Sequence, residues 1–159
     1  MLRSRVRLIR RCHDAVQRRY RNQTQIPAAC EWLLDNWYLV RRESLSIAGE
    51  LRRAKRLRFC EEGPMVFALC RSLVRAGHGM ADEGRCKSFL DGFQSITVLR
   101  RVELALFPAC LEVACLAEIA DVCREMPYSA DLDALAVRLV SPVRAKTFSA
   151  STKFRHIMI

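Results

Sequence analysis

Apolar residues recur every three or four positions along most of this chain, which is the spacing of amphipathic helices. Between residues 2 and 21 one stripe collects Leu2, Val6, Ile9, His13, Val16 and Tyr20, while arginines fill the other positions. The pattern predicts a helix that packs its stripe on a neighbour. A helix lying on a membrane surface is the sharper alternative, because basic amphipathic helices bind anionic lipid.

A second helix is predicted from Ile26 to Glu43, after the polar connection 22–25. Pro27 suits a first helical turn, where its missing N–H costs nothing. One broad apolar face then carries Ala29, Trp32, Leu33, Asn36, Trp37 and Val40. After Val40 the pattern continues through Leu45, Ile47 and Leu51, although Gly49 and a dense run of basic residues weaken the prediction of a single long helix.

Two short helices are expected next. Gly63-Pro64 marks a boundary and a helix start, and this helix should stop in the glycine-rich turn 77–79. Asp82 then caps a helix that runs to about Phe93.

The last two predicted helices also have recognisable starts. Thr97 is a candidate N-cap for a long apolar segment from Val98 to Cys123, which Pro108 must kink or interrupt. Its apolarity on all sides predicts a central buried helix. A final helix should run from Ser129 to Val140, capped by Ser129.

The predicted fold class is all-α, an irregular bundle of about six helices, because no segment shows the glycine-bounded alternation of a sheet. Residues 1–140 are expected to form the helical domain. Residues 141–159 are polar and basic without periodicity, and we expect a poorly ordered tail.

Charge is distributed unevenly along the 159 residues, whose formal net charge is +10. Eight arginines lie within residues 1–21 and a second basic block covers 41–58, whereas residues 102–137 hold seven acidic side chains and one basic one. The two regions should attract each other. A basic surface of this kind also raises association with nucleic acid or anionic lipid.

Eight cysteines are present, and no two have the C-x-x-C spacing of a zinc or redox motif. We therefore predict no metal site and expect reduced cysteines that fill the core of a cytoplasmic protein. The longest apolar stretch, 104–111, is too short to span a bilayer, and no signal peptide follows the arginine-rich start. The expected location is the cytoplasm, with the inner membrane face as a candidate contact of the first helix.

Four phrases give the chain a family resemblance. Glu31 to Tyr38, EWLLDNWY, resembles the EWLLDNF/Y motif of the cyclic β-1,2-glucan synthase family, bacterial membrane-associated enzymes that build cyclic glucans from a nucleotide sugar. GPMVFAL at 63–69, FQSITVL at 93–99 and the pair Glu103-Leu104 followed by Pro108 are similar to further family phrases in the same order. The departures include Ala105, where the family has tryptophan.

The resemblance implies a part of such an enzyme without its chemistry. The membrane helices, the glycosyltransferase domain and the phosphorylase-like domain of the family have no counterpart here, which suggests a truncated N-terminal fragment. We expect a non-catalytic scaffold or docking module that packs against those catalytic domains. This hypothesis predicts an exposed apolar patch on the helix containing Pro108.

The candidate contact residues for a sugar or another domain are Glu31, Trp32, Asp35, Asn36 and Trp37. Aromatic faces stack on sugar rings and carboxylates accept hydrogen bonds from hydroxyls. The alternative places both tryptophans in the core, with Asp35 and Asn36 bonded to nearby helix ends.

No catalytic residue and no cofactor are predicted, since the three histidines are far apart and there is no phosphate loop or nucleophile elbow. Whether the chain is an enzyme stays open, although we expect none on its own. A small basic nucleic-acid-binding protein is the alternative function. A frameshifted remnant is the third hypothesis.

Overall fold

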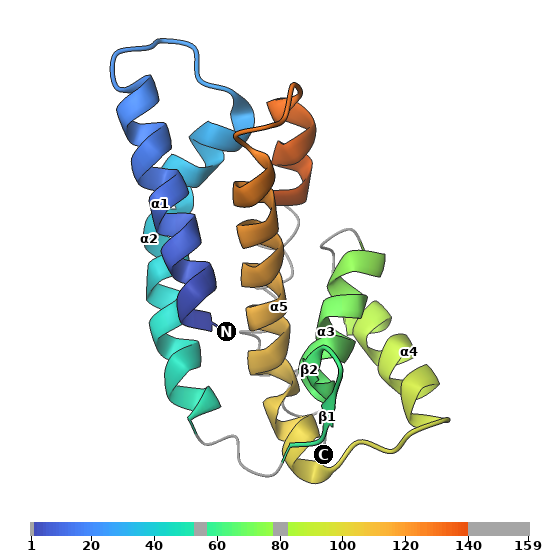
Figure 1. Cartoon of the computed structure of the whole chain (residues 1–159). Helices are drawn as coiled ribbons and strands as arrows, with labels where there is room; N and C mark the ends of the chain where they lie inside the picture. Colours follow the sequence, from blue (N-terminus) through green and yellow to red (C-terminus); the bar gives the residue numbers. More distant parts are fainter. Residues whose placement is uncertain (1, 53–56, 78–82, 140–159) are drawn as a thin grey trace.

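The computed structural model describes residues 2–52, 57–77 and 83–139. Within them the chain forms α1 (Leu2–Tyr20), α2 (Ala28–Leu51), α3 (Met65–Ala76), α4 (Glu83–Gln94), α5 (Arg101–Glu125) and a further helix at 132–139, as Figure 1 shows. The prediction of an irregular all-α bundle is confirmed. The predicted tail at 141–159, the domain boundary at 140 and the Asp82 cap lie outside the described residues.

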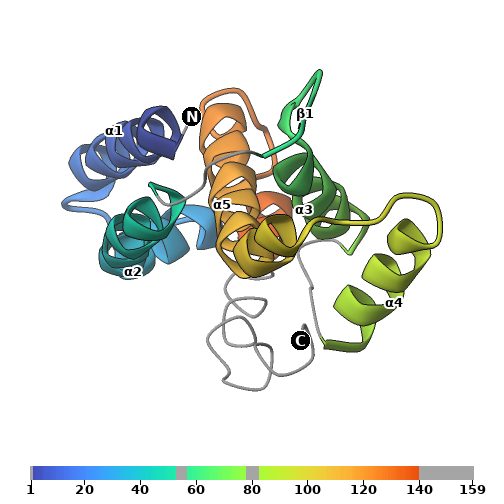
Figure 2. The ribbon, with the colours of Figure 1, turned by 90° about the horizontal axis from the view of Figure 1, so that it is seen from below.

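Helix α5 is the centre of the bundle. It stands between the α1–α2 pair on one side and α3 on the other, with α4 outside α3 (Figure 2). Fifteen of its residues are buried, among them Phe107, Leu111 and Val122. A helix that is apolar on all sides is stable only when neighbours cover every side, so the prediction of a central helix is confirmed.

Helices α1 and α2 cover one side of α5. The α1 stripe points inward, where Ile9 and Val16 are buried, and the arginines of α1 other than Arg5 stay outside. Helix α2 continues eight residues past the predicted end at Glu43, to Leu51. Burial of Ile47 in the core outweighs the helix cost of Gly49, which is about 1 kcal/mol.

A two-residue hairpin precedes α3, which the sequence analysis did not predict because its strands are too short for a visible alternation. Strands β1 (Phe59–Cys60) and β2 (Gly63–Pro64) are antiparallel, with Phe59 opposite Pro64. Gly63 has φ +115°, a conformation that side chains other than glycine rarely adopt. Pro64 then precedes the first turn of α3, which has Gly77 at its C-cap.

The start of α5 differs from the prediction. The N-cap is Arg100 and not Thr97, because the carboxylate of Glu103 accepts a hydrogen bond of 2.8 Å from the Arg100 N–H. Pro108 does not interrupt the helix, which is continuous from Arg101 to Glu125. Proline removes one hydrogen bond of the ladder, and the packing around α5 holds the helix across that gap.

The last helix begins at residue 132, capped by Asp131 and not by Ser129. An Asp131 carboxylate oxygen accepts hydrogen bonds from the N–H groups of Asp133 and Ala134, at 3.1 and 2.9 Å. Two residues before this cap, the Ser129 hydroxyl accepts a hydrogen bond of 3.2 Å from the Asp131 N–H. Leu135 and Leu139 are buried as predicted.

Candidate functional site

A buried carboxylate joins three separate segments at the start of α5. Glu103 is fully buried, and its two oxygens accept hydrogen bonds from the Arg58 N–H at 3.2 Å, from Arg58 Nε at 3.0 Å and Nη2 at 2.5 Å, and from the Arg100 N–H at 2.8 Å. Arg58 Nη2 also donates to the Val98 carbonyl at 2.8 Å. We call this set, Arg58, Val98, Arg100 and Glu103, the Glu103 junction.

The junction keeps Glu103 charged despite its burial. The side-chain hydrogen bonds from Arg58 lower the pKa of Glu103 to about 2, assisted by the backbone donors of Arg100 and Arg58, while burial acts in the opposite direction. A carboxylate with all its lone pairs occupied and so low a pKa cannot exchange protons near neutral pH. Its role is therefore to hold segments together.

Three of the four family-like phrases meet at this junction. The hairpin of Gly63 and Pro64 closes next to Arg58, whose carbonyl accepts the Met65 N–H at 2.8 Å. Val98 belongs to the phrase 93–99, and Glu103 begins the phrase that ends at Pro108. The chain between residues 58 and 103 is thus drawn back onto the first turn of α5.

Exposed apolar side chains surround the junction. Phe59 and Val98 are each 73% exposed, and Ile96 is 88% exposed. We call Phe59, Ile96 and Val98 the junction surface. The expectation of an exposed patch on the helix with Pro108 is wrong, because the exposed large apolar side chains of the described residues all lie outside α5, at Tyr38, Leu45, Phe59, Ile96, Val98, Tyr128 and Val137.

The predicted contact residues on α2 divide into two groups. Trp32 and Trp37 are half-buried and pack against the core, and the Trp37 ring stacks on His13 of α1 with centroids 5.4 Å apart. Glu31 and Asp35 are exposed on the outer side. The tryptophans therefore pack against the core, whereas the two carboxylates face solvent.

Asn36 does not bond to a neighbouring helix end. Its side-chain amide donates to the Trp32 carbonyl of the same helix at 2.8 Å. A sugar or interdomain contact at Glu31, Trp32, Asp35, Asn36 and Trp37 stays a prediction.

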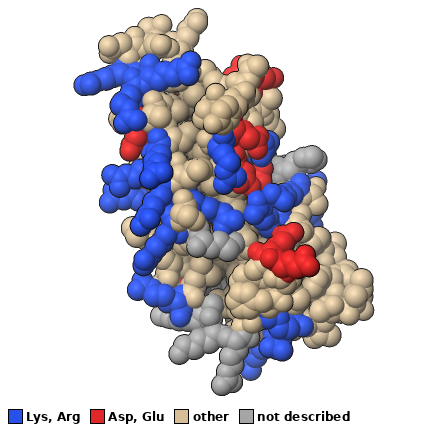
Figure 3. Space-filling view, viewed as in Figure 1, with Lys and Arg blue, Asp and Glu red and all other residues tan. Residues whose placement is uncertain are grey.

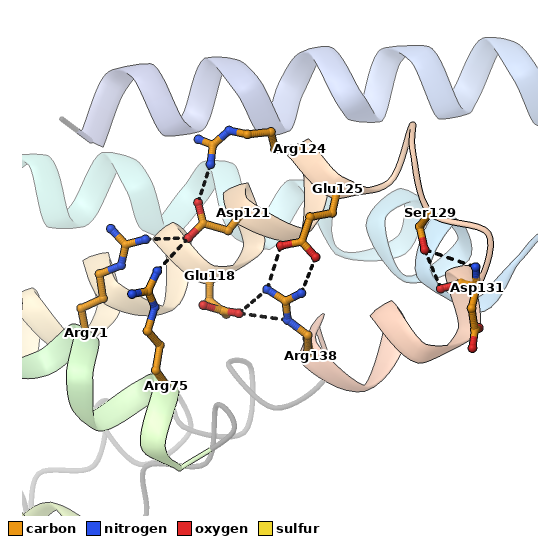
Figure 4. Close-up of polar contacts among 9 residues, drawn as sticks. All are labelled: Arg71, Arg75, Glu118, Asp121, Arg124, Glu125, Ser129, Asp131 and Arg138. Carbon is orange, nitrogen blue, oxygen red and sulfur yellow. Dashed lines mark hydrogen bonds and ion pairs between the residues drawn. The ribbon is translucent and has the colours of Figure 1, made fainter.

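A second charged cluster lines a pocket of about 310 Å³ between α3, α5 and the helix 132–139 (Figure 4). Asp121 is its centre: it accepts from Arg71 at 2.6 Å and Arg124 at 2.8 Å, and Arg75 lies 3.7 Å away. Arg138 bridges Glu118 at 2.6 Å and Glu125 at 2.5 Å.

This pocket is suited to holding helices together and has no free acid or base for catalysis, since each of its three carboxylates is paired with arginine. The guanidinium of Arg5 lies close by, over the Phe67 ring at 5.3 Å, and burial together with Arg71 lowers its pKa. Arg58 of the second basic block pairs with Glu103 of the acidic segment 102–137, whereas the arginines paired with Asp121, Glu118 and Glu125 lie outside both basic blocks, so a general attraction between the two regions stays a prediction. The sequence does not show which arginine pairs with which carboxylate, because nothing in it distinguishes Arg58 or Arg71 from the other arginines.

The outward side of α1 forms a basic face, visible as a column of blue atoms along this helix in Figure 3. Arg3, Arg7, Arg11 and Arg18 are exposed and have no ion pair with any described residue. On the whole of α1 the single carboxylate is Asp14, which lies near Arg10 and His13.

The cysteines are all free, and six are buried. Among the residues that the structure describes, no helix is long and apolar enough to cross a membrane. In the same residues no three His, Cys, Asp or Glu side chains are arranged to hold a metal ion.

Comparison with protein-family models, with curated proteins and with solved structures gives no match to this chain.

Proposed function

We propose that this chain is a non-catalytic helical docking module of a cyclic β-1,2-glucan synthase-like protein, and that it binds the catalytic domains of such a protein through the junction surface. The observation that carries the proposal is the meeting of three family-like phrases at the Glu103 junction. Residues spread over about a third of the sequence support one small region of the bundle, and exposed apolar side chains lie at its edge.

The junction surface has the composition of a contact site. A rigid backbone, fixed by the hydrogen bonds of Glu103 and by the hairpin, presents Phe59, Ile96 and Val98 to solvent. Single exposed apolar residues are common on proteins, but several gathered beside a buried ion pair indicate a surface that a partner covers. Aromatic and aliphatic anchors of this kind dominate the affinity of protein interfaces.

The test measures binding of the purified chain to the glycosyltransferase region of a cyclic β-1,2-glucan synthase produced separately. We expect saturable binding, and the variants Ile96→Asp and Val98→Asp should each weaken it at least about tenfold, as loss of an interface anchor does. Both side chains are exposed, so neither change should affect folding.

The matched control is Tyr128→Asp, which alters a side chain that is 89% exposed beyond the other end of α5. It should bind like the unaltered chain. Absence of binding by the unaltered chain, or an equal loss in all three variants, would refute the docking proposal.

A second candidate function, nucleic-acid binding, is favoured by the unpaired arginines of α1. The same helix is poorly placed to enter a membrane, because its apolar stripe is packed on α2 and α5 with Ile9 fully buried. Its arginines can contact a phosphate backbone without any rearrangement.

Fluorescence anisotropy with a short labelled DNA duplex at several salt concentrations tests this candidate. Each phosphate contact removed by Arg7→Ala, Arg11→Ala or Arg18→Ala should reduce the salt slope by about 0.9. Arg138→Ala is the control, because Glu118 and Glu125 already neutralise that arginine. Salt-insensitive binding, or binding to anionic vesicles alone, would exclude a nucleic-acid interface.

A further inference from the structure

Three sulfur atoms converge where α1 crosses the C-terminal end of α5. Cys12 Sγ lies 3.5 Å from the Sδ of Met126, and the Cys123 thiol is close enough to Cys12 for each thiol to shift the pKa of the other. Cys123 and Met126 are three positions apart at the end of α5, so they project from one side of the helix toward α1. In this cluster the sulfurs lie next to one another, whereas buried cysteines usually act as separate apolar residues of the core.

Two of these sulfurs are shielded from solvent, and the third is partly accessible to it. Cys123 and Met126 are buried, whereas Cys12 is half-buried and gives the cluster an opening to solvent. The neighbouring Cys123 thiol lowers the pKa of Cys12, and burial acts against it. Cys30 of α2 lies close enough for its charge to influence both thiols.

The arrangement matches the ligand preference of a soft monovalent cation. A metal–sulfur bond of about 2.3 Å places the sulfurs of a trigonal site about 4 Å apart, close to the observed separation of Cys12 and Met126. Zinc prefers four thiolate or imidazole ligands, whereas Cu(I) accepts thiolates together with a thioether. The third ligand of this set is the thioether of Met126 and not a His, Cys, Asp or Glu side chain.

We propose that Cys12, Cys123 and Met126 form a Cu(I)-binding site that fastens α1 to α5. On binding, Cu(I) forms bonds to both cysteine sulfurs and to the thioether, and the two S–H protons pass to solvent. No electron is transferred in this step. Cys12 and Cys123 are more than a hundred residues apart in the chain. The ion therefore links α1 to the C-terminal end of α5.

The experiment titrates the full chain with Cu(I), supplied anaerobically as its acetonitrile complex, in competition with a chromogenic Cu(I) chelator. All proteins carry Cys60→Ser, which removes the one exposed thiol. We expect one Cu(I) per chain, sulfur-only coordination by X-ray absorption, and a rise in the unfolding temperature on binding. Adding Cys12→Ser or Met126→Leu should weaken binding at least about tenfold.

Cys110→Ala is the matched control, because it removes a buried thiol of the core elsewhere on α5. Circular dichroism of each metal-free variant establishes that the variant is folded. Equal affinity of the Cys12→Ser variant and its parent would overturn the proposal, as would equal weakening by Cys110→Ala.

Discussion

Replacing Glu103 with glutamine tests how far one buried ion pair holds the N-terminal end of α5. Glutamine has nearly the same shape, but its amide nitrogen cannot accept hydrogen bonds. The variant therefore removes the charge and leaves two of the four donors from Arg58 and Arg100 without a partner. Lost pairing of this kind is a recognised cause of large destabilisation.

The magnitude follows from the pKa of Glu103, which is about 2 in the folded protein against an ordinary value of 4.5. Each pKa unit corresponds to about 1.4 kcal/mol, which gives an upper value of about 3 kcal/mol. Arg58 is 28% exposed, and water at that side screens the pair. We expect Glu103→Gln to lower the free energy of unfolding by about 2 kcal/mol at neutral pH.

The pH dependence provides an independent check. A folded-state pKa below the unfolded value contributes stability that is present above pH 4.5 and is lost as the pH falls toward 2. The difference between the unaltered chain and Glu103→Gln should therefore be constant near neutrality and shrink across this range. Comparing the two proteins cancels the titration of the other carboxylates.

Urea unfolding followed by circular dichroism, at several pH values between 7 and 3, measures both quantities. Glu62→Gln is the control, since it removes an exposed carboxylate at the neighbouring hairpin turn. A loss below about 0.5 kcal/mol, the usual size of an exposed-surface change, or a difference that does not vary with pH, would refute the reasoning about Glu103.

Three further predictions concern the core, the last helix and the thiols. Phe107→Ala should cost about 3–5 kcal/mol in urea unfolding, because Phe107 is fully buried in α5; a cost near 1 kcal/mol would contradict a central α5. Asp131→Ala should cost about 1 kcal/mol and speed hydrogen exchange in residues 132–139, because it removes their N-cap; unchanged exchange there would contradict that assignment. Cys60 should react first with a thiol reagent in the folded protein, because burial raises the pKa values of Cys110 and Cys115 to about 12; simultaneous reaction of all three would contradict the burial.

The candidate sites show where sequence reasoning was limited. The pattern placed Glu103 inside a long helix and within a family-like phrase, but it could not identify Arg58 as its partner, because that pairing joins residues 45 positions apart. The expected attraction between the basic and acidic regions is represented by the pair of Arg58 and Glu103, while the other arginines that meet the acidic segment come from outside the basic blocks. Which arginine meets which carboxylate depends on how α3 and the hairpin pack on α5.

The sequence by itself determined the helical fold class, the inward stripe of α1 and the burial of α5, because these follow from local periodicity and from how much apolar surface each segment must cover. The tertiary structure decided where helices end. Helix α2 passes Gly49 because Ile47 is needed in the core, and α5 starts at Arg101 because Glu103 reaches back to Arg100. Tertiary packing also decided the convergence of Cys12, Cys123 and Met126 and the Glu103 junction. Contacts between distant residues depend on the relative placement of whole elements, which no local pattern specifies.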